Sequence, residues 1–164
     1  MKHIITIVIA LVSMVAQAQS DYGKWILHAM FAGDNITNCI DTGDDVYYVS
    51  SNNLFRYDKD TQENEHLNRA NYLSDSGVKN IYYNRDKNYI MVTYENSNID
   101  VIDVRSGDVS NMSDIKNADI ATSKTINDIT FASGNKAVVA TDFGFVIYND
   151  RKLEMERSFI SDKA

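Results

Sequence analysis

The sequence has no proline and a single cysteine, Cys39, among its 164 residues. A lone cysteine excludes an intramolecular disulfide, and we expect Cys39 to be a small buried apolar residue. Without proline, turns must be built by Asn, Asp, Ser and the seven glycines, which suit backbone positions with positive φ. The glycines are scattered singly, so the sequence has no glycine-rich loop of the kind that cradles phosphate groups.

Basic residues are also scarce: 16 Lys and Arg face 23 Asp and Glu, for a formal net charge of −7. Binding of nucleic acid needs a basic face that neutralises phosphates, and this balance argues against such a partner. Hydrophobic residues make up 44% of the chain, which predicts a folded globular protein with a hydrated acidic surface.

The first 18 residues have the pattern of a signal peptide. Lys2 supplies the positive charge, residues 4–15 are largely apolar, and Ala16-Gln17-Ala18 is a small-x-small cleavage site. The apolar run falls short of the roughly 20 residues that span a bilayer, although a retained membrane anchor is the alternative. We expect cleavage after Ala18, no stable membrane insertion thereafter, and a mature domain at 19–164, exported to the periplasm or outer surface of a Gram-negative bacterium.

The rest of the chain repeats one plan three times: short apolar strands separated by polar turns. The predicted strands are 39–41, 45–50 and 53–58, then 79–83, 89–94 and 99–103, then 128–131, 137–141 and 144–150. A fourth, outer strand is expected in each copy at 63–67, 108–112 and 154–159. Val, Ile, Tyr, Phe and Thr fill the strands, as β-sheet propensity requires, and no long segment has helical periodicity.

The spacing of the copies predicts the fold class. Ile40 to Ile81 is 41 residues and Ile81 to Ile129 is 48, within the roughly 40–50 residues of a four-stranded propeller blade. We therefore expect an all-β partial propeller with blades at about 25–70, 71–115 and 120–160, and an inserted loop at 105–125. Three blades do not close a ring, so we expect the N-terminal part of a larger propeller. A β-sandwich is the alternative.

No catalytic residue, cofactor site or metal site is predicted. His3, His28 and His66 lack partners at metal-ligand spacing, and the acidic clusters 41–45 and 58–63 lack the features of an EF-hand. We read the first cluster as a hairpin turn containing Gly43. Tyr22, Trp25 and Phe31 could form a carbohydrate platform, but packing of the first strand is the favoured interpretation.

Catalysis by a nucleophile has no local support, because no serine lies in a Gly-x-Ser-x-Gly elbow and Cys39 has no histidine nearby in sequence. A propeller glycosidase or lyase would need acids on several innermost strands. Asp41 and Asp128 are the candidates, and they stand alone in sequence.

Two stretches resemble the propellers of bacterial two-component regulators, namely residues 45–58 and 73–81. Residues 22–25, 93–102, 126–129 and 140–148 resemble more closely the first propeller of the PorZ family, accessory proteins of the type IX secretion system. The resemblance covers about residues 25–156. It implies two propellers and a C-terminal sorting domain in a full family member, which handles anionic lipopolysaccharide at the cell surface for attachment to cargo by a partner sortase. It assigns no binding residue.

These observations predict a non-enzymatic binding or scaffold module with a protein or glycan/lipopolysaccharide partner in the cell envelope. The alternative is the extracytoplasmic glycan-sensing propeller of a hybrid two-component regulator. Neither the ligand nor the oligomeric state follows from the sequence.

Overall fold

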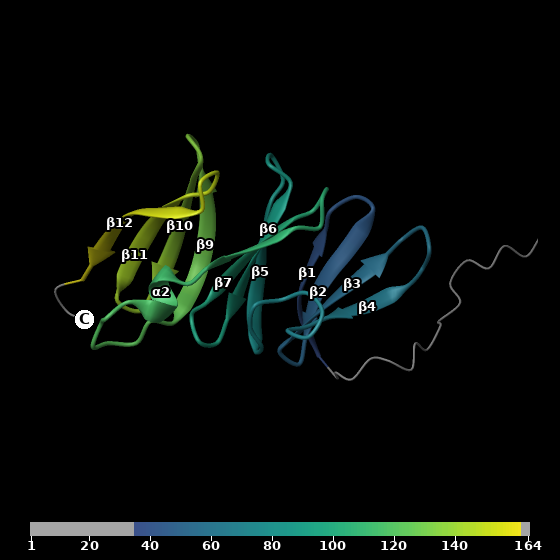
Figure 1. Ribbon diagram of the computed structural model, residues 1–164, viewed down its shortest axis with the longest axis horizontal. Coiled ribbons are helices and arrows are strands. Elements are labelled where there is room, and N and C mark those ends of the chain that lie inside the picture. Colours follow the sequence, from purple (N-terminus) through teal and green to yellow (C-terminus); the bar gives the residue numbers. More distant parts are fainter. Residues whose placement is uncertain (1–34, 162–164) are drawn as a thin grey trace, which may run out of the picture. The chain divides into compact units, whose positions relative to one another are not determined.

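The computed structural model describes residues 35–161 and contains three antiparallel sheets of four strands each (Figure 1). The first sheet holds β1 (Ile36–Asp41), β2 (Asp45–Ser50), β3 (Asn53–Asp58) and β4 (Asn64–Leu67). The second holds β5 (Val78–Asn84), β6 (Tyr89–Tyr94), β7 (Ile99–Asp103) and β8 (Val109–Met112). The third holds β9 (Ile126–Ala132), β10 (Lys136–Thr141), β11 (Gly144–Asn149) and β12 (Glu154–Ile160).

This architecture confirms the all-β class and the partial propeller. The strands of each sheet pair in chain order, as in a propeller blade, and the three sheets do not close into a ring. Three separate sheets replace the two that a β-sandwich would have. The outer strands expected at 63–67, 108–112 and 154–159 are present as β4, β8 and β12. The predicted signal peptide, together with Tyr22, Trp25, His28 and Phe31, lies outside the described residues.

Each sheet has a β-bulge at the same place in its first strand. The register shifts leave Thr37, Lys79 and Asn127 as the extra residues of β1, β5 and β9. A bulge bends its strand and redirects the side chains beyond it. The shared bulge also aligns the three sheets residue by residue, which allows equivalent positions to be compared.

In the first two sheets, we call the face that is turned toward the next sheet along the chain the leading face, and the opposite face the trailing face. In the third sheet, the same names apply to the faces that carry the equivalent residues. Cross-strand ladders on the leading faces are Asn38–Val49–Leu54–Leu67, Asn80–Thr93–Ile99–Met112 and Asp128–Ala140–Phe145–Phe159. Those on the trailing faces are Cys39–Tyr48–Phe55–His66, Ile81–Val92–Asp100–Asn111 and Ile129–Val139–Val146–Ser158.

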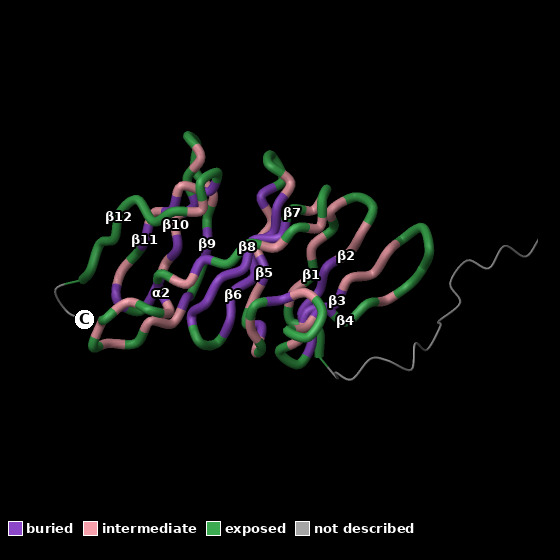
Figure 2. Tube along the Cα trace, viewed as in Figure 1, coloured by how far each residue is buried: buried purple, intermediate pink, exposed green. Residues whose placement is uncertain are grey.

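The core lies between the sheets as two clusters. One joins the leading face of the first sheet to the trailing face of the second, with Val49 and Leu54 against Ile81 and Val92. The other joins the second sheet to the third in the same way. The second sheet is therefore covered on both faces, and every residue of β6 is buried (Figure 2).

Cys39 corrects one prediction, because its side chain is exposed and not buried. Its equivalents Ile81 and Ile129 are buried in the two core clusters. Cys39 lies on the trailing face of the first sheet, and no earlier sheet covers that face within residues 35–161. An apolar residue at this position is therefore buried in the second and third sheets, but not in the first.

The segment 105–125, expected to be an inserted loop beyond its outer strand, also contains a short helix, α2 (Asp114–Asn117). Ile115 of α2 is buried in the cluster between the second and third sheets. A single apolar residue in a four-residue helix leaves no detectable helical period, so the helix could not be read from the sequence.

Candidate functional site

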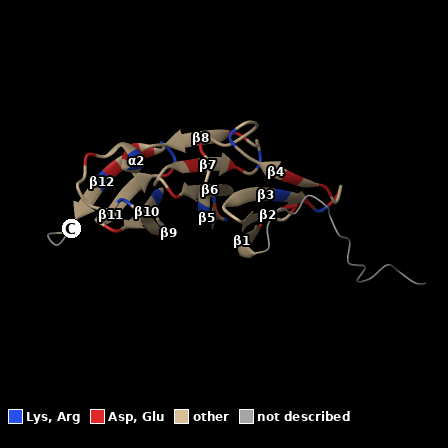
Figure 3. Cartoon of the chain, turned by 90° about the horizontal axis from the view of Figure 1, so that it is seen from below, with Lys and Arg blue, Asp and Glu red and all other residues tan. Residues whose placement is uncertain are grey.

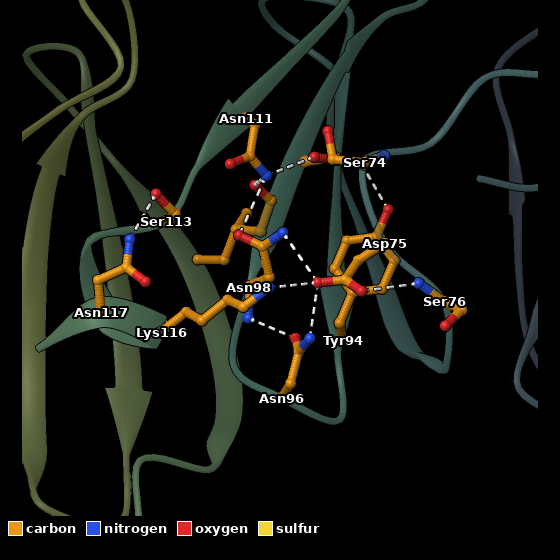
Figure 4. A network of polar contacts seen from close by, with 12 residues as sticks. Ser74, Asp75, Ser76, Tyr94, Asn96, Asn98, Asn111, Ser113, Lys116 and Asn117 are labelled. Atoms are coloured by element: carbon orange, nitrogen blue, oxygen red, sulfur yellow. Dashed lines mark hydrogen bonds and ion pairs between the residues drawn. The ribbon is translucent and has the colours of Figure 1, made fainter. Parts of the chain in front are cut away.

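A network of polar side chains lies where three segments meet beside the second sheet (Figure 4). The segments are the loop between β4 and β5, the turn between β6 and β7, and the end of β8 with α2. Two carboxylates, Asp75 and Asp100, receive most of the hydrogen bonds in it. Loops held on a rigid scaffold are where proteins most often place binding residues, which makes this network a candidate binding site.

Asp100 is fully buried in β7, at a trailing-face position where the other sheets have Phe55 and Val146. Its Oδ2 accepts the hydroxyl of Tyr94 at 2.5 Å and the backbone N–H of Ser74 at 2.8 Å. Its Oδ1 accepts Asn111 Nδ2 at 2.8 Å. Burial, and then the bond to Asp100, raise the pKa of Tyr94 well above its ordinary value. Asp100 thereby ties the β4–β5 loop to the second sheet.

Asp75 lies at the exposed side of the same network. Its Oδ2 accepts Lys116 Nζ at 2.7 Å and Asn96 Nδ2 at 2.6 Å. Partial burial acts to raise the pKa of this carboxyl, but the hydrogen bonds from Lys116, Asn96 and the N–H of Ser76 outweigh it and lower the pKa to about 2. Asp75 is therefore charged at neutral pH, and it fastens α2 to the loop and turn.

The network has little capacity left for chemistry. A carboxylate offers about four lone-pair positions, and Asp100 already receives three donors from the protein. Tyr94, with its raised pKa, is a poor acid at neutral pH. The arrangement positions loops and does not provide a general acid or base.

A second polar junction joins the second and third sheets. The side chain of Asp150, fully buried, accepts Lys87 Nζ at 2.6 Å and the Tyr89 hydroxyl at 2.7 Å. Two open clefts flank this junction, with volumes of about 260 Å³ and 290 Å³. Asp150 lines the first cleft with Arg151, while Lys87 lines the second.

The histidine and acidic candidates from the sequence occupy separate places. His66 stacks on Phe55 with a centroid distance of 4.9 Å, and its Nε2 lies 3.2 Å from Asn53 Oδ1. Asp41 accepts the N–H of Gly43 at 2.9 Å and Lys59 Nζ at 2.7 Å. Gly43 has φ of 108°, as a tight turn requires.

The glycosidase candidates Asp41 and Asp128 belong to the first and third sheets, and Asp128 accepts the N–H of Ile129 at 2.9 Å. Among residues 35–161, no group of three or more His, Cys, Asp or Glu side chains could hold a metal ion. Within the same range, no helix is long and apolar enough to cross a membrane.

Sequence reasoning missed the buried carboxylates Asp100 and Asp150. Asp100 had a detectable signal, since it interrupts the apolar run Ile99–Ile102 where the other copies are apolar. Asp150 directly follows β11, and Asp or Asn residues stand at the ends of several strands here, so its position in the sequence did not indicate burial.

Comparison with known proteins places this geometry in a family. Residues 46–164 match the family described as "TSS9, PorZ, N-terminal beta-propeller domain". A search of the curated proteins found no match.

Among solved structures, PorZ of the type IX secretion system of Porphyromonas gingivalis is similar over 74% of this chain, with 25% identity and a TM-score of 0.67. The extracellular domain of a putative hybrid two-component system from B. thetaiotaomicron is similar over 90%, with 15% identity and a TM-score of 0.68. The chain spans 16% of the PorZ chain and 20% of the two-component chain. The match to the family covers most of the three sheets, and the chain belongs to the PorZ N-terminal β-propeller domain family.

Proposed function

We propose that this chain is a non-enzymatic binding or scaffold module, exported by its N-terminal signal, that acts in type IX secretion and in the handling of surface lipopolysaccharide. The family match over residues 46–164 carries this proposal. The similar PorZ of P. gingivalis is described as an essential bacterial surface component of the type IX secretion system.

The polar networks support a scaffold better than a catalyst. Asp75 and Asp100 each accept hydrogen bonds from at least two segments of the chain, and Asp150 accepts them from Lys87 and Tyr89 of the neighbouring sheet. Such carboxylates fix loops and sheets relative to one another. A binding surface benefits from this, because a preorganised surface loses less conformational entropy when a partner binds. The expected partner is a protein or a glycan, including lipopolysaccharide, in the cell envelope.

The test is an in-frame deletion of residues 35–161 from the chromosomal gene. We expect cargo proteins of the secretion system to be retained in the periplasm and to lack attached lipopolysaccharide. Replacement of the exposed Lys152 by Ala should leave secretion unchanged and serves as the control. Normal cargo on the surface of the deletion strain would overturn the proposal.

A second candidate is the extracytoplasmic glycan-sensing propeller of a hybrid two-component regulator. It is favoured by the shared fold over 90% of this chain with such an extracellular domain. It predicts a histidine kinase in the same polypeptide, and a change in transcription when glycan fragments are supplied. The same deletion strain separates the candidates, because this one predicts a lost transcriptional response with cargo secretion intact.

A further inference from the structure

The larger of the two clefts beside the Lys87–Asp150 pair lies between two hairpins. Asn84 and Lys87 of the β5–β6 hairpin form one wall, and Phe131 and Asn135 of the β9–β10 hairpin form the other. Both hairpins lie at the same end of their sheets (Figure 1). The volume of about 290 Å³ is close to the lower limit of roughly 300 Å³ for pockets that hold small ligands, so the cleft has room for one ring-sized unit.

Asp150 holds the two walls at a fixed spacing. Its side chain accepts Lys87 Nζ at 2.6 Å, and its backbone N–H donates to the carbonyl oxygen of Asn135 at 3.0 Å. Asn84 stiffens the first wall, because its Oδ1 accepts the backbone N–H of Lys87 at 3.2 Å and its Nδ2 donates to the Tyr89 hydroxyl at 3.1 Å. The cleft is therefore formed before a ligand arrives, which lowers the entropic cost of binding.

Phe131 gives the cleft an aromatic surface. The ring is only partly buried against the core cluster between the second and third sheets. It meets the Tyr89 ring at a centroid distance of 5.5 Å and an angle of 89°, so the contact between the two sheets fixes its orientation. A fixed, partly open aromatic ring offers a flat apolar surface to a ligand.

Three polar side chains in the cleft retain hydrogen-bonding capacity. Asp86, Ser133 and Asn135 line it, and within residues 35–161 none of their side chains forms a hydrogen bond or ion pair with another group. The carboxylate accepts hydrogen bonds, whereas the hydroxyl and the amide both donate and accept. Lys87 adds no free positive charge, because Asp150 pairs with it. The remaining charge, that of Asp86, disfavours an anionic ligand such as phosphate.

We propose that this cleft binds a neutral sugar ring of a glycan, with the C–H face of the ring on Phe131 and its hydroxyls on Asp86, Ser133 and Asn135. A pyranose presents a face of C–H groups bordered by hydroxyls that donate and accept, and the cleft offers the complement of both. The inference goes beyond the proposed function, and it rests on that function only for the expectation of a glycan partner in the envelope. The anionic groups of a lipopolysaccharide are not bound here.

Saturation-transfer NMR of the exported polypeptide, produced from the native gene, tests the proposal. The probes are the methyl pyranosides of glucose, galactose, mannose and N-acetylglucosamine, all of them neutral. We expect saturation transfer to at least one probe, and titration with that probe should show an affinity about tenfold lower in Asp86→Ala, because a hydrogen bond to a charged acceptor is lost. Asp60→Ala, in the exposed β3–β4 turn, is the matched control and should bind as the wild type does.

Transfer to none of the four probes overturns the proposal, and so does an equal affinity in Asp86→Ala and Asp60→Ala. Phe131→Leu keeps an apolar side chain against the core cluster but removes the flat ring. It should weaken binding about fivefold while the melting temperature stays within a few degrees of the wild type. Unchanged affinity in Phe131→Leu would overturn the stacked geometry.

The sugar site and the proposed function fail in different experiments. A chain that binds none of the probes, although its deletion still blocks cargo secretion, would overturn the site and leave the proposed function in place. Sugar binding that is sensitive to Asp86→Ala, together with normal cargo in the deletion strain, would support the site and overturn the role in secretion.

Discussion

Asp100 occupies a core position where the equivalent residues of the other sheets are Phe55 and Val146. A buried carboxylate survives there because Tyr94, Ser74 and Asn111 each donate a hydrogen bond to it. At this position, hydrogen bonds that connect the sheet to the β4–β5 loop take the place of the apolar packing found in the other sheets. Removing it takes away the acceptor of the Tyr94 hydroxyl and of the Ser74 N–H, while Asn111 keeps Asn98 Oδ1 and the Ile99 carbonyl as acceptors. Each buried unsatisfied group costs about 1–3 kcal/mol.

Replacing Asp100 by Ala should therefore lower the free energy of unfolding by about 3 kcal/mol. The comparison variant is Asp86→Ala in an exposed turn, which should change it by less than about 0.5 kcal/mol. Urea denaturation followed by circular dichroism measures both. Equal effects of the two substitutions would show that Asp100 does not hold the loop.

Asp75 predicts a pH dependence of stability. Its pKa is about 2 in the folded chain, against an ordinary 3.8, so its contribution is full well above pH 4 and is lost as the pH falls toward 2. Because Lys116 is 39% exposed, solvent screening limits this contribution to roughly 1 kcal/mol. The Asp75→Asn protein should melt below the wild type at pH 7 and together with it near pH 2. A gap of constant size across this range would contradict the assignment.

For single residues, the apolar or charged character of a side chain did not always predict whether that side chain is buried. The lone Cys39 is of a residue type that is usually buried, and its equivalents Ile81 and Ile129 are core residues, yet Cys39 itself is exposed. Asp100 is the converse, a charged residue brought into the core by partners from three segments. Both depend on tertiary neighbours that no local pattern encodes.

Among the elements, the pair β11–β12 depends on Gly144. Its φ is 146°, and a Cβ added there would lie 1.9 Å from the backbone oxygen of Phe159 on the neighbouring strand. Gly144 pairs with Ile160 in the ladder, so the two strands approach closely only because this position has no side chain. β12 is exposed along its whole length and has few other contacts to hold it.

Gly144→Ala should separate β12 from β11 at that end and destabilise the chain by about 2–3 kcal/mol. Gly134→Ala is the matched control, since Gly134 also has positive φ, at 76°, but open space around its Cα. Gly134→Ala should lower the free energy of unfolding by only about 1 kcal/mol, because its sole effect is backbone strain at positive φ. Hydrogen exchange of the β12 amides distinguishes the two. Unchanged protection in Gly144→Ala would mean that the strands can shift without loss.

The strands could be predicted from the sequence, whereas the helix α2 could not. The strands follow alternating or continuous apolar runs bounded by Asn, Asp and Gly, so their positions emerge from period and turn chemistry. The helix α2 depends instead on Ile115 fitting the space between two sheets and on Lys116 reaching Asp75. Those contacts join residues far apart in the chain, and four residues give no period to detect.

For the molecule as a whole, apolar clusters hold neighbouring sheets together. Figure 3 marks where the basic and acidic residues lie along the strands and turns. The ion pair of Lys87 and Asp150 links the second sheet to the third, with Asp150 fully buried and Lys87 32% exposed. The exposed pair Lys136–Glu156, at 3.7 Å, lies within the third sheet and is open to solvent. Both pairs join one positive and one negative side chain, but they differ in burial. We therefore expect disruption of the Lys87–Asp150 pair to lower the free energy of unfolding more than disruption of the exposed pair.

Lys87→Met should destabilise the chain by about 3 kcal/mol, because it leaves the Asp150 carboxylate buried without its cation. The double variant Lys87→Met/Asp150→Leu should recover part of that loss. Lys136→Met, the control, should change stability by less than about 0.5 kcal/mol. Urea denaturation of these proteins and of the single variant Asp150→Leu, which completes the double-mutant cycle, measures the effects. A double variant less stable than Lys87→Met would show that the pair itself, and not the stranded charge, dominates.

Every sheet is made from consecutive strands joined by short turns, and none borrows a strand from elsewhere in the described chain. Low sequence separation between paired residues favours rapid formation of local structure. As the polypeptide emerges from its N-terminal side, the first sheet can assemble before residues of the third are available. Each completed leading face would then act as a template on which the following four strands settle, so that growth is directional. A substitution early in the chain should slow the ordering of every later sheet, whereas one in β12 should leave the earlier steps untouched.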